Sequence, residues 1–129
     1  MSEQKTLVVL TALDVEYDSI RSKLTDVRAQ SHPAGTRFEV GRLADGECRV
    51  VIAQVGKGNL AAAVLAERAI GEFDPAALLF SGVAGALRSS IALGDVVVAT
   101  HVYAYHGGTS LDDGLKSRPR VWEISHRAQ

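Results

Sequence analysis

Short apolar runs and polar, glycine-containing breaks alternate along the first third of the chain. The run TLVVLTA at residues 6–12 is continuous, which is typical of a strand buried on both faces of a sheet. Asp14 follows at a position suited to a helix N-cap, and apolar residues then recur at helical spacing. We therefore predict an amphipathic helix over residues 14–25. Because proline and glycine punctuate the next segment, we predict a loop over residues 26–35.

Two further strand-like runs predict a β-hairpin. They cover residues 36–43 and 47–55 and flank the turn Ala44-Asp45-Gly46. Asp-Gly between two such runs is a hairpin signal, since tight hairpin turns need residues that tolerate positive φ angles. The two strands are therefore predicted to be antiparallel neighbours.

An alanine-rich segment after the hairpin predicts a second helix. It opens at Gly56 and Gly58 and should end near Gly71 and the Asp74-Pro75 break. The two opening glycines and Ala61 satisfy a G-x-G-x-x-A dinucleotide fingerprint. The strand before them belongs to a predicted hairpin and not to the first strand of a βαβ unit, so we expect no dinucleotide and no other cofactor.

The most informative stretch runs over residues 76–100. An apolar strand at residues 76–81 leads into a turn of small residues at 82–86, and a second strand restarts after the Leu93-Gly94-Asp95 turn. Ligands of open α/β sheets bind beyond the carboxyl ends of the strands, where bare backbone allows close approach. The small-residue turn is therefore either a ligand site or a tight structural bend, because glycine punctuates strands for both reasons.

Composition favours one ordinary globular domain over residues 1–129. The chain is 47% hydrophobic and 22% charged, with a net charge of −1, so it carries no electrostatic footprint for nucleic acid or an anionic membrane. No apolar run is long enough to span a bilayer. The single Cys48 excludes an internal disulfide, and we expect a cytoplasmic protein.

The remaining candidate side chains carry less information. His101, His106 and His126 lack the tight spacing of a zinc site, so we expect no metal. Tyr103 and Tyr105 alternate on the strand after LGDVVVAT, and they either line a pocket or cover one face of a sheet.

Three blocks together resemble a known family. They are LTALDVEYDSIRSKL, VGKGNLAAAVLAERAI and FSGVAGALRSSIALGDVVVATHVYAYHGG. In this order they resemble the N-terminal half of the nucleoside phosphorylase and nucleosidase superfamily. They are most like methylthioadenosine/S-adenosylhomocysteine nucleosidases and the nucleosidase-like effector domains of bacterial multidomain proteins. The resemblance implies an α/β, three-layer αβα fold with a mixed central sheet, truncated to its N-terminal half.

The resemblance assigns a catalytic role to Glu16. This residue falls on the acid that activates or positions the attacking water in the family. The chemistry fits, because N-glycosidic cleavage passes through an oxocarbenium-like sugar that a carboxylate stabilises. The alternative is a solvated acid in the first turn of a helix, where the helix dipole favours it.

The small-residue turn matches the family's substrate-binding turn. Ala84, Gly85 and Ala86 match residues that line the purine, and Gly82 and Val83 match residues beside the sugar. Many family members carry serine where this chain has Val83, and the phosphorylases need a hydroxyl and an arginine near this turn to hold phosphate. The departure favours hydrolysis over phosphorolysis.

A second departure concerns the 5′ end of the substrate. Lys57, between Gly56 and Gly58, stands where the nucleosidases have an aliphatic residue lining an apolar 5′ pocket. An ammonium beside the N–H groups of a helix N-terminus favours a 5′-phosphate or polyphosphate, hence an AMP-like or ATP-like substrate. The equally weighted alternative is that Lys57 points to solvent from the start of the helix.

Three functions therefore remain open. The first is a purine nucleoside or nucleotide N-ribohydrolase that releases free purine. The second is a non-catalytic purine-nucleotide-binding or assembly module, and the third is a phosphorolytic nucleoside phosphorylase. Family members are roughly twice as long as this chain. We therefore expect that the chain is either a fragment of a longer polypeptide or depends on an obligate partner. Such a partner would be a second copy in a homo-oligomer or a complementing C-terminal segment.

Overall fold

A computed structural model describes residues 5–44, 46, 48–56, 58–104, 108–111, 114–117 and 120–123. The chain divides into two compact units, Met1–Gly85 and Ala86–Gln129, and each is described by itself. Within the described ranges, no helix is long and apolar enough to cross a membrane.

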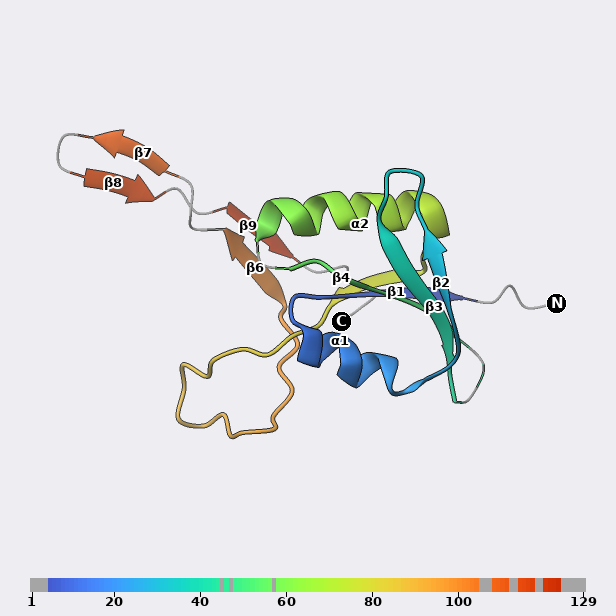
Figure 1. Cartoon of the computed structure of the whole chain (residues 1–129). Helices are drawn as coiled ribbons and strands as arrows, with labels where there is room; N and C mark the ends of the chain where they lie inside the picture. Colours follow the sequence, from blue (N-terminus) through green and yellow to red (C-terminus); the bar gives the residue numbers. More distant parts are fainter. Residues whose placement is uncertain are drawn as a thin grey trace. The chain divides into compact units, whose positions relative to one another are not determined.

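The first unit is built around a mixed five-stranded sheet (Figure 1). Its elements are β1 (Thr6–Thr11), α1 (Asp14–Arg21), β2 (Leu24–Ser31), β3 (Arg37–Leu43), β4 (Arg49–Gln54), α2 (Asn59–Phe73) and β5 (Ala77–Phe80). The strand order is β2-β3-β4-β1-β5. β1 runs parallel to both β4 and β5, whereas β2, β3 and β4 are antiparallel. The predicted hairpin, second helix and last strand of this unit are confirmed.

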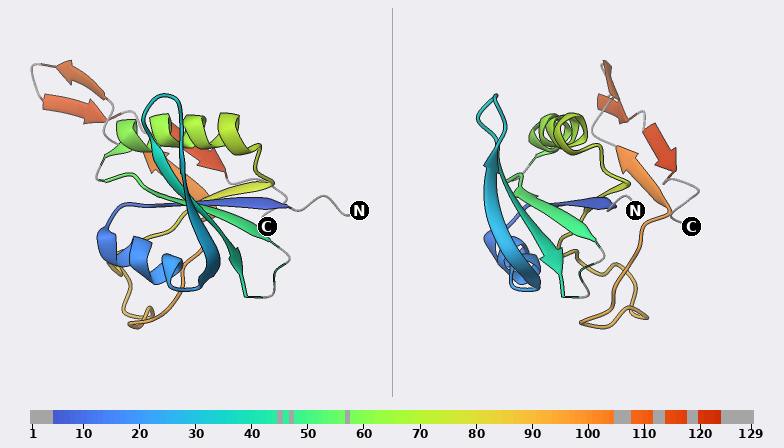
Figure 2. Two further views of the ribbon diagram at one scale, coloured as in Figure 1. Left: turned by 45° about the vertical axis from the view of Figure 1, so that its right-hand side comes forward. Right: turned by 90° about the vertical axis from the view of Figure 1, so that its right-hand side faces the viewer.

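The two helices cover opposite faces of the sheet, which gives the unit three layers (Figures 1 and 2). Alternation along β1 decides which side chain meets which helix, because successive strand residues point to opposite faces. Val8 and Leu10 pack in the cluster under α2, whereas Val9 packs in the cluster with Tyr17 and Ile20 of α1. A continuous apolar run is therefore what a central strand of this sheet requires.

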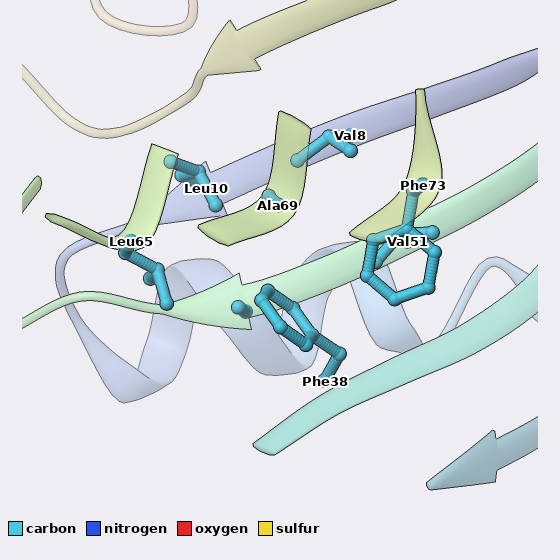
Figure 3. Close-up of a cluster of buried hydrophobic side chains, with 8 residues drawn as sticks. Val8, Leu10, Phe38, Val51, Leu65, Ala69 and Phe73 are labelled. Atoms are coloured by element: carbon cyan, nitrogen blue, oxygen red, sulfur yellow. The ribbon is translucent and has the colours of Figure 1, made fainter. Parts of the chain in front are cut away.

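Two aromatic rings anchor α2 to the sheet. Phe38 of β3 and Phe73, the last residue of α2, meet edge to face with ring centroids 5.1 Å apart (Figure 3). Such a pair contributes about 0.5–1.5 kcal/mol beyond the area that it buries. Asp74 then ends the helix in a left-handed conformation, with its N–H bonded to the carbonyl of Ile70.

Two predictions for residues 14–35 are wrong. The helix ends at Arg21, and residues 24–31 form β2, where a loop was expected. Leu24 packs against the α1 side of the core as part of this strand. Its neighbours are mostly polar because β2 lies at the edge of the sheet, so their composition gives no strand signal. The proline and glycine do form a turn, at residues 32–36.

The strand before Gly56 has a second role that the hairpin prediction missed. β4 closes the hairpin with β3, but it also runs parallel to β1 and leads through α2 to β5. Because β5 is parallel to β1 as well, β4-α2-β5 is a parallel crossover with β1 between its strands. The argument that this strand belongs only to a hairpin is therefore wrong.

The second unit contains two small antiparallel pairs. β6 (His101–Ala104) pairs with β9 (Arg120–Glu123), and β7 (Gly108–Leu111) pairs with β8 (Gly114–Ser117). The strand predicted directly after the Leu93-Gly94-Asp95 turn is wrong, since residues 95–99 lie outside any strand and their three valines are exposed. A strand needs a hydrogen-bonded neighbour, and none of the described strands pairs with this run.

We predict that truncating Phe38 destabilises the first unit severely. Its side chain is 0% exposed, and removing it leaves a cavity against Phe73. Phe38→Ala should lower the free energy of unfolding by about 3–5 kcal/mol, measured by urea denaturation. The control is Leu60→Ala on α2, where the side chain is 87% exposed. Its effect should stay within about 0.5 kcal/mol, and equal losses in both variants would contradict this account of the core.

Candidate functional site

Three turns lie together at the carboxyl ends of the parallel strands in the first unit. β4, β1 and β5 are parallel neighbours, so their carboxyl ends lie together, and each leads directly into a turn. The main chain links these turns beyond the strands. Val55 donates to the carbonyl of Thr11 at 2.7 Å, and Ser81 donates to the carbonyl of Leu10 at 2.9 Å. The ligand turn predicted from the sequence lies at this carboxyl end of the sheet.

Glu16 binds two of these turns at once. Its Oε2 accepts hydrogen bonds from the N–H groups of Ala12 and Leu13 at 2.9 and 3.0 Å. Its Oε1 accepts a hydrogen bond from the N–H of Val83 at 2.8 Å. The carboxylate therefore satisfies amides at the start of α1 and holds the turn that follows β5.

These hydrogen bonds determine the charge of Glu16. The N–H of Val83 and then that of Leu13 lower its pKa below the ordinary value of 4.5, while desolvation acts in the opposite direction. At neutral pH the side chain is therefore an anion that only accepts hydrogen bonds. A carboxylate has about four acceptor positions, and amides occupy three of them, so one position on Oε1 remains for water or a substrate hydroxyl.

Gly82 makes the close approach of Glu16 possible. A Cβ at this position would lie 2.9 Å from Oε1 and 3.2 Å from Cδ of the glutamate. Its φ angle is not in the positive range, so it is space and not backbone conformation that requires glycine here. Any larger residue would displace the carboxylate from the Val83 amide.

The turn between β4 and α2 requires its glycines because of their backbone conformation and not because of space. Gly56 and Gly58 have φ angles of +74° and +120°, which are strained for other residues. A Cβ added at either glycine would meet nothing within 4 Å, so the space beside these two residues is open. Gln54 at the end of β4 donates to Asp14 Oδ1 at 2.6 Å and ties this turn to the start of α1. Sequence reasoning missed this polar link.

The structure brings together only some of the predicted site residues. Glu16, Gly82 and Val83 are in direct contact, and Ala84 and Gly85 continue the same turn, with both exposed. Ala86 falls in the second unit. Lys57 lies outside the described residues, as do Tyr105, His106 and His126. The roles of Gly56, Gly58 and the turn in substrate binding stay predictions.

The fold and this arrangement define a class of protein. It is an α/β protein whose mixed sheet presents a fixed carboxylate and glycine turns at the carboxyl ends of its parallel strands, where small-molecule sites of such proteins usually lie. The family follows from comparison with known proteins. The family model described as "Phosphorylase superfamily" matches residues 6–127, and the chain belongs to this superfamily.

Known relatives indicate which members of the superfamily the chain resembles. The chain is 33% identical over 108 residues to a 5′-methylthioadenosine/S-adenosylhomocysteine nucleosidase of Staphylococcus epidermidis, over 84% of this chain and 46% of the relative. The Colwellia psychrerythraea nucleosidase, crystallised with adenine, is 32% identical with a TM-score of 0.73. That match covers 81% of this chain and 42% of the solved one.

A third match extends the same pattern. The Neisseria meningitidis nucleosidase, crystallised with methylthio-immucillin-A, is 30% identical with a TM-score of 0.72, over 82% of this chain and 45% of that one. The chain thus spans less than half the length of the relatives that it matches. The predicted superfamily and the αβα fold, over about half of the relatives' length, are confirmed.

We predict that Gly82→Ala releases the Glu16 carboxylate without unfolding the chain, because the group in the way is the end of a side chain and not backbone. The pKa of Glu16 should rise toward 4.5 as the Val83 hydrogen bond is lost, measured by NMR titration of the carboxyl carbon. Gly71→Ala in α2 is the control, since its added Cβ meets nothing. It should stabilise the helix by about 0.5–1 kcal/mol. An unchanged Glu16 pKa in Gly82→Ala would refute the steric argument.

We also predict a pH-dependent contribution of Glu16 to stability. A carboxyl whose pKa is lowered in the folded state stabilises it above the unfolded value, here 4.5, and this stability is lost as pH falls through the folded pKa. The difference in unfolding free energy between the parent and Glu16→Gln should therefore shrink below pH 4.5. Urea denaturation across pH measures it. Glu39, whose pKa is also lowered by the Arg21 side chain, is present in both proteins and cancels.

Proposed function

We propose that this chain carries the N-terminal part of a purine N-ribohydrolase site, which hydrolyses an N-glycosidic bond and releases free purine. The observation that carries the proposal is the Glu16 carboxylate, held by three amides against the glycine turn with one acceptor position free. Two of the similar structures hold adenine or a nucleoside analogue inhibitor, which supports a purine ligand.

In this mechanism Glu16 acts on water and on developing charge. Water attacks C1′ of the sugar and loses a proton, the bond from C1′ to the purine nitrogen breaks, and the purine leaves with the electron pair and takes up a proton. The free Oε1 position accepts a hydrogen bond from the water and orients it. The carboxylate also stabilises the oxocarbenium-like sugar, and this electrostatic term suits an acid whose pKa is lowered.

The choice of nucleophile and of 5′ group is proposed from two residues of the sequence, Val83 and Lys57. Val83 is 76% exposed and offers no hydroxyl to phosphate, which supports hydrolysis over phosphorolysis. A lysine at position 57 supports a 5′-phosphate or polyphosphate on the substrate. A thioether nucleoside, the substrate in the relatives' names, is the alternative that the test below includes.

The proposal includes a partner for the first unit. Among the described strands, β5 is hydrogen bonded only to β1, and Leu79 and Phe80 on it are exposed. An apolar edge strand of this kind favours association, so we propose a homo-oligomer or a complementing C-terminal segment. A cytoplasmic location is proposed from the unpaired Cys48.

We predict purine release that depends on Glu16. The purified chain is incubated with ATP, AMP, adenosine and methylthioadenosine, with and without phosphate, and free purine is followed by chromatography. Glu16→Gln should lose about 10²-fold or more of the rate, because its amide cannot accept all three N–H groups and carries no charge. Glu67→Gln, an exposed acid on α2 far along the chain, is the control and should keep the parent rate.

Each other outcome selects a different function. Tight nucleotide binding without purine release in any arm would replace the hydrolase with a binding module. Turnover only in the presence of phosphate would indicate a phosphorylase. A Lys57→Leu variant that treats nucleotides and nucleosides in the parent's ratio would remove the argument for a 5′-phosphate.

A further inference from the structure

Three arginines lie on one face of the sheet, away from the carboxyl ends of the strands where Glu16 lies. Arg28 of β2, Arg42 of β3 and Arg49 of β4 line an open cavity of about 690 Å³. Strand pairing places them on the same face, since Arg42 lies directly opposite Arg49 and Arg28 directly opposite Val40. Val40 and Val51 belong to the α2 side of the core, so this is the face that α2 covers further along.

A β-bulge directs Arg28 to this face. Thr25 pairs with Arg42, whereas Arg28, three residues later, pairs with Val40, only two residues away in β3. The extra residue reverses the alternation of β2, because without it Arg28 would point to the opposite face. Asp26 inside the bulge has a φ angle of +53°.

Gly41 provides the room that the bulge needs. A Cβ on this residue of β3 would lie 3.0 Å from the carbonyl oxygen of Thr25 and 3.1 Å from Cβ of Leu24. Two specialised backbone features, a bulge and a close approach, thus combine to place a third arginine on the same face as the other two. Bulges often serve to redirect a side chain in this way.

None of these arginines forms an ion pair with another residue in the part of the chain that the structure describes. The ion pairs within the described ranges join Arg21 to Glu39 and His101 to Glu123, and neither includes one of these three. Like charges directly opposite each other on neighbouring strands destabilise a sheet, so the Arg42 and Arg49 pair opposes folding. Asp26 is the carboxylate of the cavity lining, and it does not form an ion pair with them.

Arg49 is also held in place. Its guanidinium carbon lies 5.4 Å from the centroid of the Phe73 ring, a cation–π distance, at the C-terminus of α2. Gln30, another lining residue, donates its side-chain amide to Glu72 of the same helix at 2.8 Å, and Glu72 forms no ion pair with the three arginines. Among the described residues, the cavity therefore presents three guanidinium groups that take part in no ion pair, and one of them contacts an aromatic ring.

We propose that this cavity binds a small phosphate-bearing ligand, with Arg28, Arg42 and Arg49 as its anchors. Guanidinium groups bind phosphate oxygens through paired hydrogen bonds, and three of them match a multiply charged oxyanion better than a monovalent carboxylate. The bound anion would remove the repulsion between Arg42 and Arg49. This site neither uses nor depends on the proposed hydrolase function.

The site lies at the opposite end of the strands from Glu16. Arg49 opens β4 and pairs with Thr6 at the start of β1, while the Glu16 site follows Thr11 at its end. At roughly 3.3 Å per residue the two ends of β1 are about 16 Å apart. A ligand in the arginine cavity is therefore separate from one at the glycine turn.

Calorimetry on the full chain tests the proposal with pyrophosphate, inorganic phosphate, AMP and acetate as probes. Pyrophosphate should bind, and Arg42→Gln should weaken it at least about tenfold, equivalent to about 1.4 kcal/mol. Arg120→Gln, an exposed arginine of β9, and Glu16→Gln should leave the affinity unchanged. Because Glu16→Gln is expected to abolish purine release, failure of the two proposals can be told apart.

The remaining arms identify the source of the phosphate or overturn the site. Binding of AMP that Arg42→Gln weakens assigns the phosphate of a nucleotide, whereas binding of pyrophosphate or phosphate alone assigns a free oxyanion. A thermal melt adds a second readout. Arg42→Gln should melt higher than the parent without anion and should lose the rise in melting temperature that pyrophosphate gives the parent. Equal affinity in the parent and in Arg42→Gln, binding of acetate as tight as that of pyrophosphate, or no binding at millimolar concentration would each overturn the proposal.

Discussion

One carboxylate links the parts of the first unit that matter for its chemistry. Glu16 caps the start of α1 through Ala12 and Leu13 and, through Val83, holds a turn that is 67 residues away in the sequence. The carboxylate replaces water with three backbone N–H groups, which keeps it ionised in a half-buried position. Helix position, turn position and charge therefore depend on one another, and a change in any of them alters the other two.

The polarity of the strands separates two kinds of chemistry. At the carboxyl ends of β4, β1 and β5 the turns present an acceptor carboxylate and exposed backbone. On the α2 face near the start of β4, side chains present guanidinium donors. Backbone amides dominate the first site and side chains the second, because only turns leave unpaired N–H groups and strand interiors do not. The sheet of the first unit thus keeps a negative and a positive site apart.

Local sequence signals predicted the elements that local physics determines. The continuous run of β1, the Asp-Gly hairpin, the alanine-rich α2 and the strand before Gly82 all carry short-range patterns, and each is present in the structure. β2 was missed because an edge strand is solvated and its polar residues resemble a loop. The strand expected to restart directly after Asp95 was wrong, since residues 96–99 lie outside any strand and apolar composition alone does not supply a hydrogen-bonded neighbour. The resemblance assigned Glu16 and Val83 to the same site, but their contact was not predicted, since no spacing rule spans 67 residues.

A sequence motif cannot distinguish the two physical reasons for which the glycines of the candidate site are required. Gly56 and Gly58 are required by their φ angles, so any replacement there strains the backbone itself. Gly82 is required by the space that the Glu16 carboxylate occupies, and a replacement there leaves the backbone relaxed but moves the acid. Substitution at the first pair therefore reports on folding of the turn, whereas substitution at Gly82 reports on the carboxylate. Only the second kind of glycine ties a motif directly to the proposed chemistry, and it is the coordinates of Glu16 that reveal it.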